Sequence, residues 1–260
     1  MTAELRVVWL LAIRSVRQAL RRPQMLAPVV LLPSVFLVAN TGAAGRAPSL
    51  PGFPPVPAFL DFELPGIILL AATLAAVPGG TALALDVERN FLDRFLAAPM
   101  PRAIAVTGRL AGIGLVGSLA SVVFLLAGVL FGMQLQSGPL GAGLIVVLAG
   151  LTAAGFGGLG AAIAIATGKA SYVTGSFPLV FLLLFLSSTF FPAELLRDPG
   201  ATIAAGNPLT WVADGMRGPI LNPGVDLQTT LAAFGGVAVV GVIGAGSAYI
   251  ALRRRLVATA

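Results

Sequence analysis

Six long apolar runs dominate this sequence and decide what the chain can fold into. Charged residues make up only 10% of its 260 residues and hydrophobic residues 57%, whereas a soluble domain carries about 25% charged residues. A chain this apolar cannot cover itself with polar surface in water, so we expect lipid to be its solvent. The runs cover residues 25–40, 62–85, 110–133, 139–167, 172–191 and 227–252.

The lengths of these runs fit membrane-spanning helices. A helix of about 24 residues rises roughly 36 Å, which is enough to cross the hydrocarbon of a bilayer. A helix also satisfies its own backbone hydrogen bonds, as lipid requires. The first run is short and is interrupted by Pro28 and Pro33. We predict an all-α integral membrane protein with six transmembrane helices in a single domain, residues 1–260.

The basic residues predict the orientation, because Lys and Arg accumulate on the cytoplasmic side of membrane proteins. With both termini placed in the cytoplasm, thirteen of the sixteen basic residues fall inside. Only Arg46, Arg197 and Arg217 fall outside, and this arrangement needs an even number of spans. Topology thus explains the net charge of +6, and we expect no nucleic-acid partner, since basic residues are not interleaved with aromatics on a soluble face.

Residues 4–22 precede the first apolar run and have an amphipathic pattern. Trp9, Ile13, Val16 and Leu20 recur at three- and four-residue steps, while arginines fill other positions. The apolar part is too short for a signal peptide and lacks a small-residue cleavage site. We predict a helix lying in the cytoplasmic interface of the bilayer; the alternative is an arginine cluster that only sets topology.

The densest charge lies between the second and third runs, from Asp86 to Arg109. Residues 86–98 have a helical pattern, and Pro99 stops the helix. One face carries four apolar side chains, Phe91, Leu92, Phe95 and Leu96, and the other faces carry Glu88, Arg89, Asp93 and Arg94. Such a helix either lies on lipid or fills a groove on a soluble partner, and these residues alone leave both alternatives open.

Three stretches resemble one known family. The stretch "ERNFLDRFLAAPMPRAIAVTGR" resembles the segment after the second span of ABC-2 type ABC transporter permeases, especially the daunorubicin-resistance type of drug and lipid exporter. "FFPAELL" at 190–196 and "NPLTWVADGMRG" at 207–218 are similar to that family's segments at the end of the fifth span and before the sixth. The matching residues of the first stretch are Glu88, Arg89, Leu92, Asp93, Phe95, Leu96, Pro99, Arg102, Gly108 and Arg109.

The resemblance implies one half of a dimeric membrane domain, paired with a second copy or a homologous permease. Two cytoplasmic ATPase subunits would bind ATP and Mg²⁺. Each would contact one half of the membrane domain through a coupling helix, here residues 86–98. The coupling residues would be Glu88, Arg89, Phe91, Leu92, Asp93, Phe95 and Leu96.

Residues 192–223 carry charges and Trp211 on the outer side. We predict short helices that re-enter the extracellular interface, with Trp211 at headgroup depth. They form either an outer gate or a capped surface loop. The gate candidates are Phe191, Pro192, Glu194, Asn207, Pro208 and Trp211.

Missing residues exclude several functions. The chain has no Cys and no His, so we expect neither a metal site nor catalytic residues. Gly168-Lys169 is followed by Ala, and Ile163 stands where a phosphate-binding loop needs Gly, so any ATP is bound by another chain. Apart from Asp61 and Glu63 at an outer rim, the runs hold no acid, which disfavours ion-coupled transport.

Glycine-rich stretches at 154–160 and 235–246 predict close packing of helices; the alternative is that these faces slide during transport. Lys169 is the single lysine among the sixteen basic residues, which is typical of a GC-rich bacterial genome. We predict a permease that exports a hydrophobic drug, antibiotic or lipid through the bacterial cytoplasmic membrane. The alternatives are export of polysaccharide or another solute, a gradient-driven carrier, and a non-transporting assembly factor.

Overall fold

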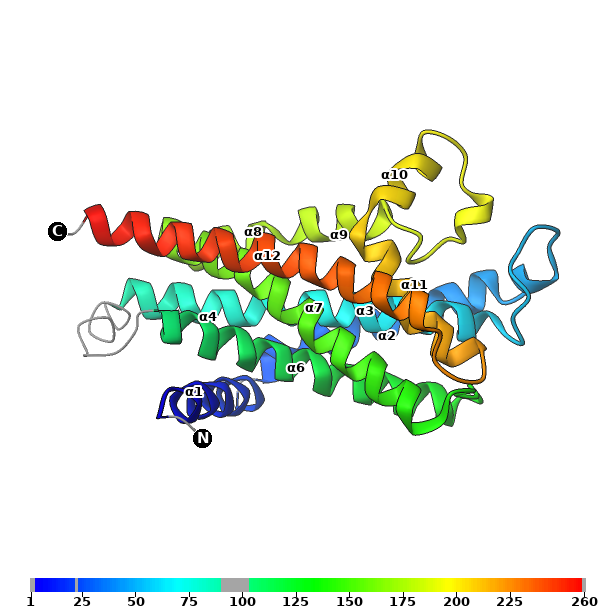
Figure 1. The fold of residues 1–260 in the computed structure, drawn as a ribbon, viewed down its shortest axis with the longest axis horizontal. Helices are drawn as coiled ribbons and strands as arrows, with labels where there is room; N and C mark the ends of the chain where they lie inside the picture. The colour runs from blue at the N-terminus through cyan, green and yellow to red at the C-terminus, as the bar shows by residue number, and fades with distance from the viewer. Residues whose placement is uncertain (1–2, 22, 90–102, 259–260) are drawn as a thin grey trace.

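The protein is a bundle of long helices that run along one axis (Figure 1). The computed structural model describes residues 3–21, 23–89 and 103–258. Five stretches in this part of the chain are long and apolar enough to cross a membrane, so the prediction of an all-helical multi-span membrane protein is confirmed. The long helices are α2 (Pro23–Ala44), α3 (Phe59–Leu74) with α4 (Ala76–Glu88), α6 (Ala103–Leu130), α7 (Gly138–Thr167) and α12 (Leu227–Ala258).

The chain termini and three of the connections between helices lie at opposite ends of the bundle. Both chain termini lie at the same end, together with the end of α4 and the turn after α7 (Figure 1). The connections over residues 45–58, 131–137 and 222–226 lie at the opposite end. This arrangement agrees with the separation of basic residues along the sequence, since Arg46 belongs to the second end and Arg253–Arg255 to the first.

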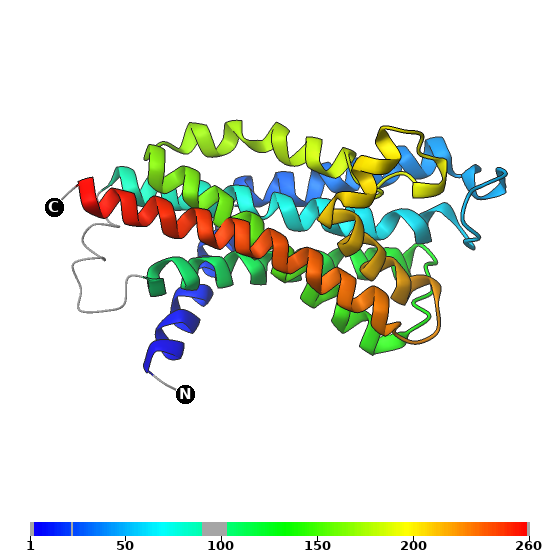
Figure 2. The same cartoon turned by 45° about the horizontal axis from the view of Figure 1, so that its top comes forward.

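Helix α1 (Ala3–Leu20) crosses the bundle instead of running along it, as Figure 2 shows. It packs on the first turns of α6, where a Cβ on Gly108 or Gly112 would come within 2.8 Å of Leu11 or 2.4 Å of Ser15. Trp9 and Leu20 remain exposed. The helix is formed as the sequence predicts, and its place in the membrane interface stays a prediction.

The fifth predicted span differs most from the structure. Residues 170–185 form two short helices, α8 (Ala170–Gly175) and α9 (Phe177–Phe185), instead of one helix over 172–191. Pro178 has no backbone N–H, so it cannot donate the hydrogen bond that would continue the helix across Ser176. After α9 the Ser187 hydroxyl donates to the Leu184 carbonyl (2.6 Å), and such short polar side chains compete with the helix for backbone groups.

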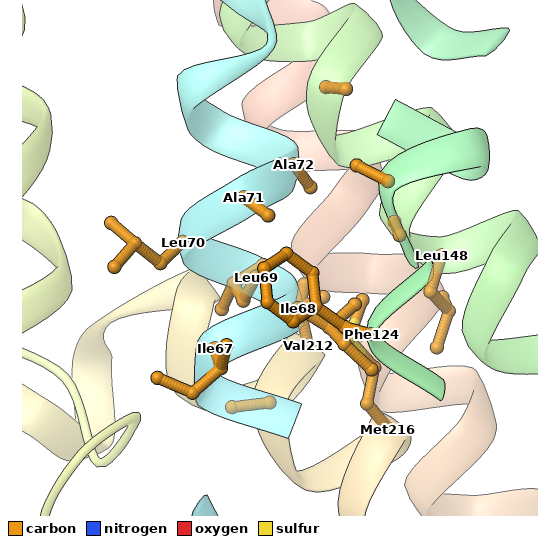
Figure 3. Close-up of a cluster of buried hydrophobic side chains, with 14 of the residues drawn as sticks. Ile67, Ile68, Leu69, Leu70, Ala71, Ala72, Phe124, Leu148, Val212 and Met216 are labelled. Atoms are coloured by element: carbon orange, nitrogen blue, oxygen red, sulfur yellow. The ribbon is translucent and has the colours of Figure 1, made fainter. Parts of the chain in front are cut away.

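Helix α3 is the centre of the packed core. All its residues except Leu60 are buried, and α2, α6, α7 and α11 (Pro208–Leu221) pack around it. Figure 3 shows Ile67 and Ile68 of α3 gathered with Phe124 of α6 and Met216 of α11. The side chains of one continuous apolar helix therefore hold elements from both halves of the sequence together.

Glycines set the closest helix crossing, between α7 and α12. A Cβ on Gly158 would lie 2.4 Å from the carbonyl carbon of Gly244, and one on Gly244 would lie 2.0 Å from the carbonyl oxygen of Gly155. Real Cβ atoms do not approach backbone so closely, so only glycine fits. The prediction of close packing through glycine-rich faces is confirmed at this crossing.

Substitution of Gly158 by Ala should separate α7 from α12 and lower stability by about 1–3 kcal/mol, as overpacking does. Gly143 is the matched control, because it lies on the same helix with open space around its Cβ position; Gly143→Ala should be neutral or stabilising, since Ala is the better helix former. Thermal unfolding of the purified protein in detergent measures both. Equal melting temperatures for the two variants would contradict the crossing.

Candidate functional site

The end of α4 is fixed on the bundle just before the predicted coupling residues. Val87 is buried in a small apolar cluster with Ile165 of α7 and Leu252 of α12. The neighbouring Glu88 is exposed, and its Oε1 accepts a hydrogen bond from the backbone N–H of Ala170 (3.2 Å). Glu88, two residues before the undescribed segment 90–102 begins, thus holds the end of α4 close to the turn between α7 and α8.

The two flanks of segment 90–102 are joined by an ion pair. Asp86 on α4 pairs with Arg109 on α6, and the two side chains are 19% and 16% exposed. A charge pair so little exposed is much less screened than a surface pair. The ion pair links α4 to α6, and α1 packs on Gly108 and Gly112 of α6 close to Arg109.

At the opposite end of the bundle, Asn207 caps α11. Its Oδ1 accepts from the backbone N–H of Leu209 (2.9 Å), and its Nδ2 donates to the carbonyl of Leu183 on α9 (2.8 Å). Pro208 occupies the first helical position, where its missing N–H is harmless. The Asn-Pro pair therefore starts α11 and at the same time fixes it to the end of α9.

The remaining outer-gate candidates lie near this cap or in the loop before it. Trp211 is 37% exposed, and its Nε1 donates to the carbonyl of Ala205 at the end of α10 (Gly200–Gly206) (3.2 Å). Phe191 is exposed. Pro192 is buried and precedes a 3-10 turn, Ala193–Leu195, that carries the exposed Glu194.

A buried arginine connects the outer elements. Arg217 on α11 donates from Nε to the carbonyl of Phe62 on α3 (3.2 Å) and from Nη2 to the carbonyls of Ser188 and Thr189 (both 3.3 Å). Its Nη1 pairs with Asp214 (2.5 Å), and its guanidinium lies 4.1 Å from the centroid of the Phe62 ring. One side chain thus satisfies backbone carbonyls of two separate segments.

Burial affects both members of this pair. It raises the pKa of the Asp214 carboxyl, and the attraction of Arg217 opposes this rise while the negative charge of Glu194 adds to it. Burial also lowers the pKa of Arg217, with Asp214 and Glu194 acting in the opposite direction. Glu194 is therefore electrostatically part of the outer cluster, although it belongs to the loop.

Comparison with known proteins identifies the family of this chain. The model of the family described as "ABC-2 type transporter" matches residues 6–221, which is most of the chain. The chain belongs to the ABC-2 transporter family. It is also 29% identical, over 201 residues, to the "Daunorubicin resistance ABC transporter permease protein DrrB1" of Streptomyces coeruleorubidus, a match that covers 75% of this chain and 68% of that one.

Membership explains the missing catalytic groups. The membrane subunit of an ABC-2 transporter has no catalytic activity of its own, and it pairs with an ABC ATPase subunit, which binds ATP. The protein is thus a multi-pass membrane permease, as the resemblance implied.

The structure places only some of the predicted coupling residues of this permease. Glu88 and Arg89 lie at the base of the segment, both exposed. The others, Phe91, Leu92, Asp93, Phe95 and Leu96, lie outside the described residues. Sequence reasoning missed the Asp86–Arg109 pair, although its members are the first and last charges of the charged run.

The end of the permease opposite the chain termini likewise contains contacts that the sequence did not predict. Asn207, Pro208 and Trp211 come together at the start of α11, whereas Phe191, Pro192 and Glu194 lie in the preceding loop. Arg217 was counted only as an outer charge. The spacing of Asp214 and Arg217, three residues apart within an otherwise apolar helix, is the sequence signal that identifies them as a pair.

Reversing one charge of the Asp86–Arg109 ion pair should destabilise the permease, and reversing both should restore much of the lost stability. Asp86→Arg places two cations together, and Arg109→Asp places two acids together; each should cost about 2 kcal/mol or more, because an unpaired, largely buried charge remains. The double exchange recreates the pair. Thermal unfolding of all three variants tests this, and a double variant no better than either single one would refute the pairing.

Replacing Arg217 by Met should loosen the outer end of the permease by about 2–4 kcal/mol, because three backbone carbonyls and Asp214 lose their donor. Arg197→Met is the matched control, since Arg197 is exposed in the same outer region. Melting temperature and the rate of proteolysis between 186 and 207 measure the effect. If both variants behave alike, Arg217 does not connect the outer elements.

Proposed function

We propose that this permease exports a hydrophobic drug, antibiotic or lipid-like compound across a bacterial cytoplasmic membrane, driven by two ATPase subunits. The observation that supports the coupling role is the pair of contacts around the start of segment 86–98. Asp86 pairs with Arg109 on α6, and Glu88 holds the turn before α8. A push on a segment mounted in this way is transmitted directly to α4, α6 and α8.

The orientation follows from the same base. The end of α4, where the segment begins, lies at the end of the bundle that carries both termini (Figure 1), and the concentration of arginine in the sequence there favours the cytoplasmic side. In this proposal α8 and α9 complete a sixth crossing together with residues 186–191, and α1 lies in the inner interface. A second copy of the chain, or a homologous permease, forms the other half.

The substrate class is supported by two observations. The relative whose name mentions daunorubicin resistance is a drug-resistance permease by that name. The cavities of this chain among the spans are lined mainly by apolar side chains, which suits a lipophilic compound better than a sugar polymer. At the outer end, Asn207, Trp211 and the loop with Phe191, Pro192 and Glu194 form the gate through which the compound leaves.

Aspartates at Phe91 and Phe95 should abolish binding of the ATPase subunit, because a charge at either position destroys an apolar contact with a groove on the partner. Tagged permease is purified from its native membrane in mild detergent, and the co-purifying proteins are quantified by mass spectrometry. We expect a near-stoichiometric ATPase with the natural sequence and at least a tenfold loss in the double variant.

Phe131→Asp is the control, since Phe131 is a largely exposed phenylalanine at the opposite end of the bundle. It should retain the ATPase. Capture of equal amounts of ATPase by all three proteins would exclude the two phenylalanines from the contact, and absence of any ATPase would argue against the coupling role of the segment.

A further inference from the structure

Helix α1 presents three different faces along its length. One face packs on α6, where Ala12 of α1 is buried. A second face is apolar and leaves Trp9 and Leu20 exposed. The third face is basic, because its exposed arginines recur at steps of eight, three and four residues, which keep them on one side of a helix. These arginines are Arg6, Arg14, Arg17 and Arg21.

A hollow of about 520 Å³ lies over the basic face. The guanidinium group of arginine matches phosphate in charge and in hydrogen-bond geometry, and neighbouring apolar side chains suit the first carbons of an acyl chain. The hollow has both kinds of side chain in its wall. The described residues that line it all belong to α1 or to the turn at its end, and they are Leu10, Ile13, Arg14, Arg17, Gln18 and Arg21.

The described part of the protein supplies little negative charge to this face. Arg17 and Arg21 take part in no ion pair among the described residues, and the sequence of residues 5–21 contains no acid. Two acids with described side chains, Asp86 and Glu88, belong to the end of the bundle that carries the termini (Figure 1). The first pairs with an arginine of α6 and the second accepts from the backbone after α7, so both are already engaged.

The chain itself keeps the basic face near the bilayer. The first candidate span begins at Leu26, five residues after Arg21 and nine after Arg17. Five residues reach at most about 18 Å even when fully extended, so Arg21 stays close to the membrane surface. Because α1 runs across the bundle axis (Figure 2), the other arginines of its basic face lie at a similar depth.

An anionic phospholipid supplies what this face lacks. Its phosphate pairs with guanidinium groups, and its negative charge is not cancelled by an amine of its own, as it is in a zwitterionic headgroup. Its acyl chains can lie against the exposed apolar face, beside Leu20. Basic residues clustered on an amphipathic helix or beside a span attract anionic lipids for these reasons.

We infer that Arg14, Arg17 and Arg21 form a binding site for the phosphate of an anionic phospholipid such as phosphatidylglycerol, with its acyl chains against Leu20. The lipid is a bound ligand of α1 and not a transported compound, so this inference goes beyond the proposed export function and does not depend on it. Because α1 packs on the first turns of α6 at Gly108, a lipid held there also ties α6 to the membrane surface.

The test uses a permease with a single tryptophan beside the site. Leu20→Trp places the reporter three residues from Arg17, and Trp9→Phe and Trp211→Phe remove the two natural tryptophans. The full-length protein is reconstituted in phosphatidylcholine vesicles that contain either brominated phosphatidylglycerol or brominated phosphatidylcholine. Bromine quenches tryptophan on contact, so stronger quenching by phosphatidylglycerol measures its enrichment at position 20. Two or three exposed charge pairs should give an enrichment of about threefold to tenfold.

Removing two of the charges should remove most of this preference. Arg17→Gln/Arg21→Gln should lower the enrichment to about twofold or less. Arg253→Gln/Arg254→Gln is the matched control, because it removes two exposed arginines of α12 at the same end of the bundle; it should keep the preference. Raising NaCl from about 0.05 M to about 0.5 M should weaken the preference without any change of arginine, since salt screens exposed charges.

Equal quenching by the two lipids in the protein with its natural arginines would overturn the inference. Equal losses in the two double variants would assign the preference to the net charge of the protein and would overturn the site. Loss of captured ATPase in Arg17→Gln/Arg21→Gln, with no lipid preference before the change, would assign the basic face to the ATPase subunit instead. Normal ATPase capture with no lipid preference would reject only this inference and leave the proposed function intact.

Discussion

Backbone hydrogen bonding in lipid is the constraint on which this structure depends. Water cannot satisfy a peptide group there, so every break in a helix needs another donor. Arg217 supplies hydrogen-bond donors at one such break, after α9. Helix α9 ends at Phe185, and the guanidinium binds the carbonyls of Ser188 and Thr189 in the irregular segment that follows. The buried charge of Arg217 is compensated there by Asp214 and by the ring of Phe62.

The lipid solvent also explains where the helices pack most tightly. Helices gain little from apolar burial when lipid is as apolar as they are, so close contact through small residues must hold them. The contact of Gly158 with Gly244 meets that need between α7 and α12. These two helices also bury Val87 at the end of α4. The crossing therefore supports the end of α4 as well as the bundle.

Local sequence patterns predicted the long helices but not the contacts between them. Apolar runs identified α2, α3–α4, α6, α7 and α12, because a spanning helix must be apolar over its whole length. The division of α8 from α9 was missed, since hydropathy does not register Gly175-Ser176 and Pro178 as a break. The pairing of Asp86 with Arg109 and the burial of Glu63 against Asn40 and Thr41 depend on tertiary structure, which no periodicity contains.

The α8–α9 pair connects the two ends of the permease. The backbone N–H of Ala170 donates to Glu88 at the end that carries the termini, and the carbonyl of Leu183 accepts from Asn207 toward the opposite end. Among the residues of this pair only Val173 and Leu184 are fully buried, so its displacement exposes little new apolar surface. Elements with few buried contacts are the ones that move at low free-energy cost. Since Glu88 also holds Ala170, the end of α4 is tied directly to this loosely packed pair, which is the connection that the proposed coupling role requires.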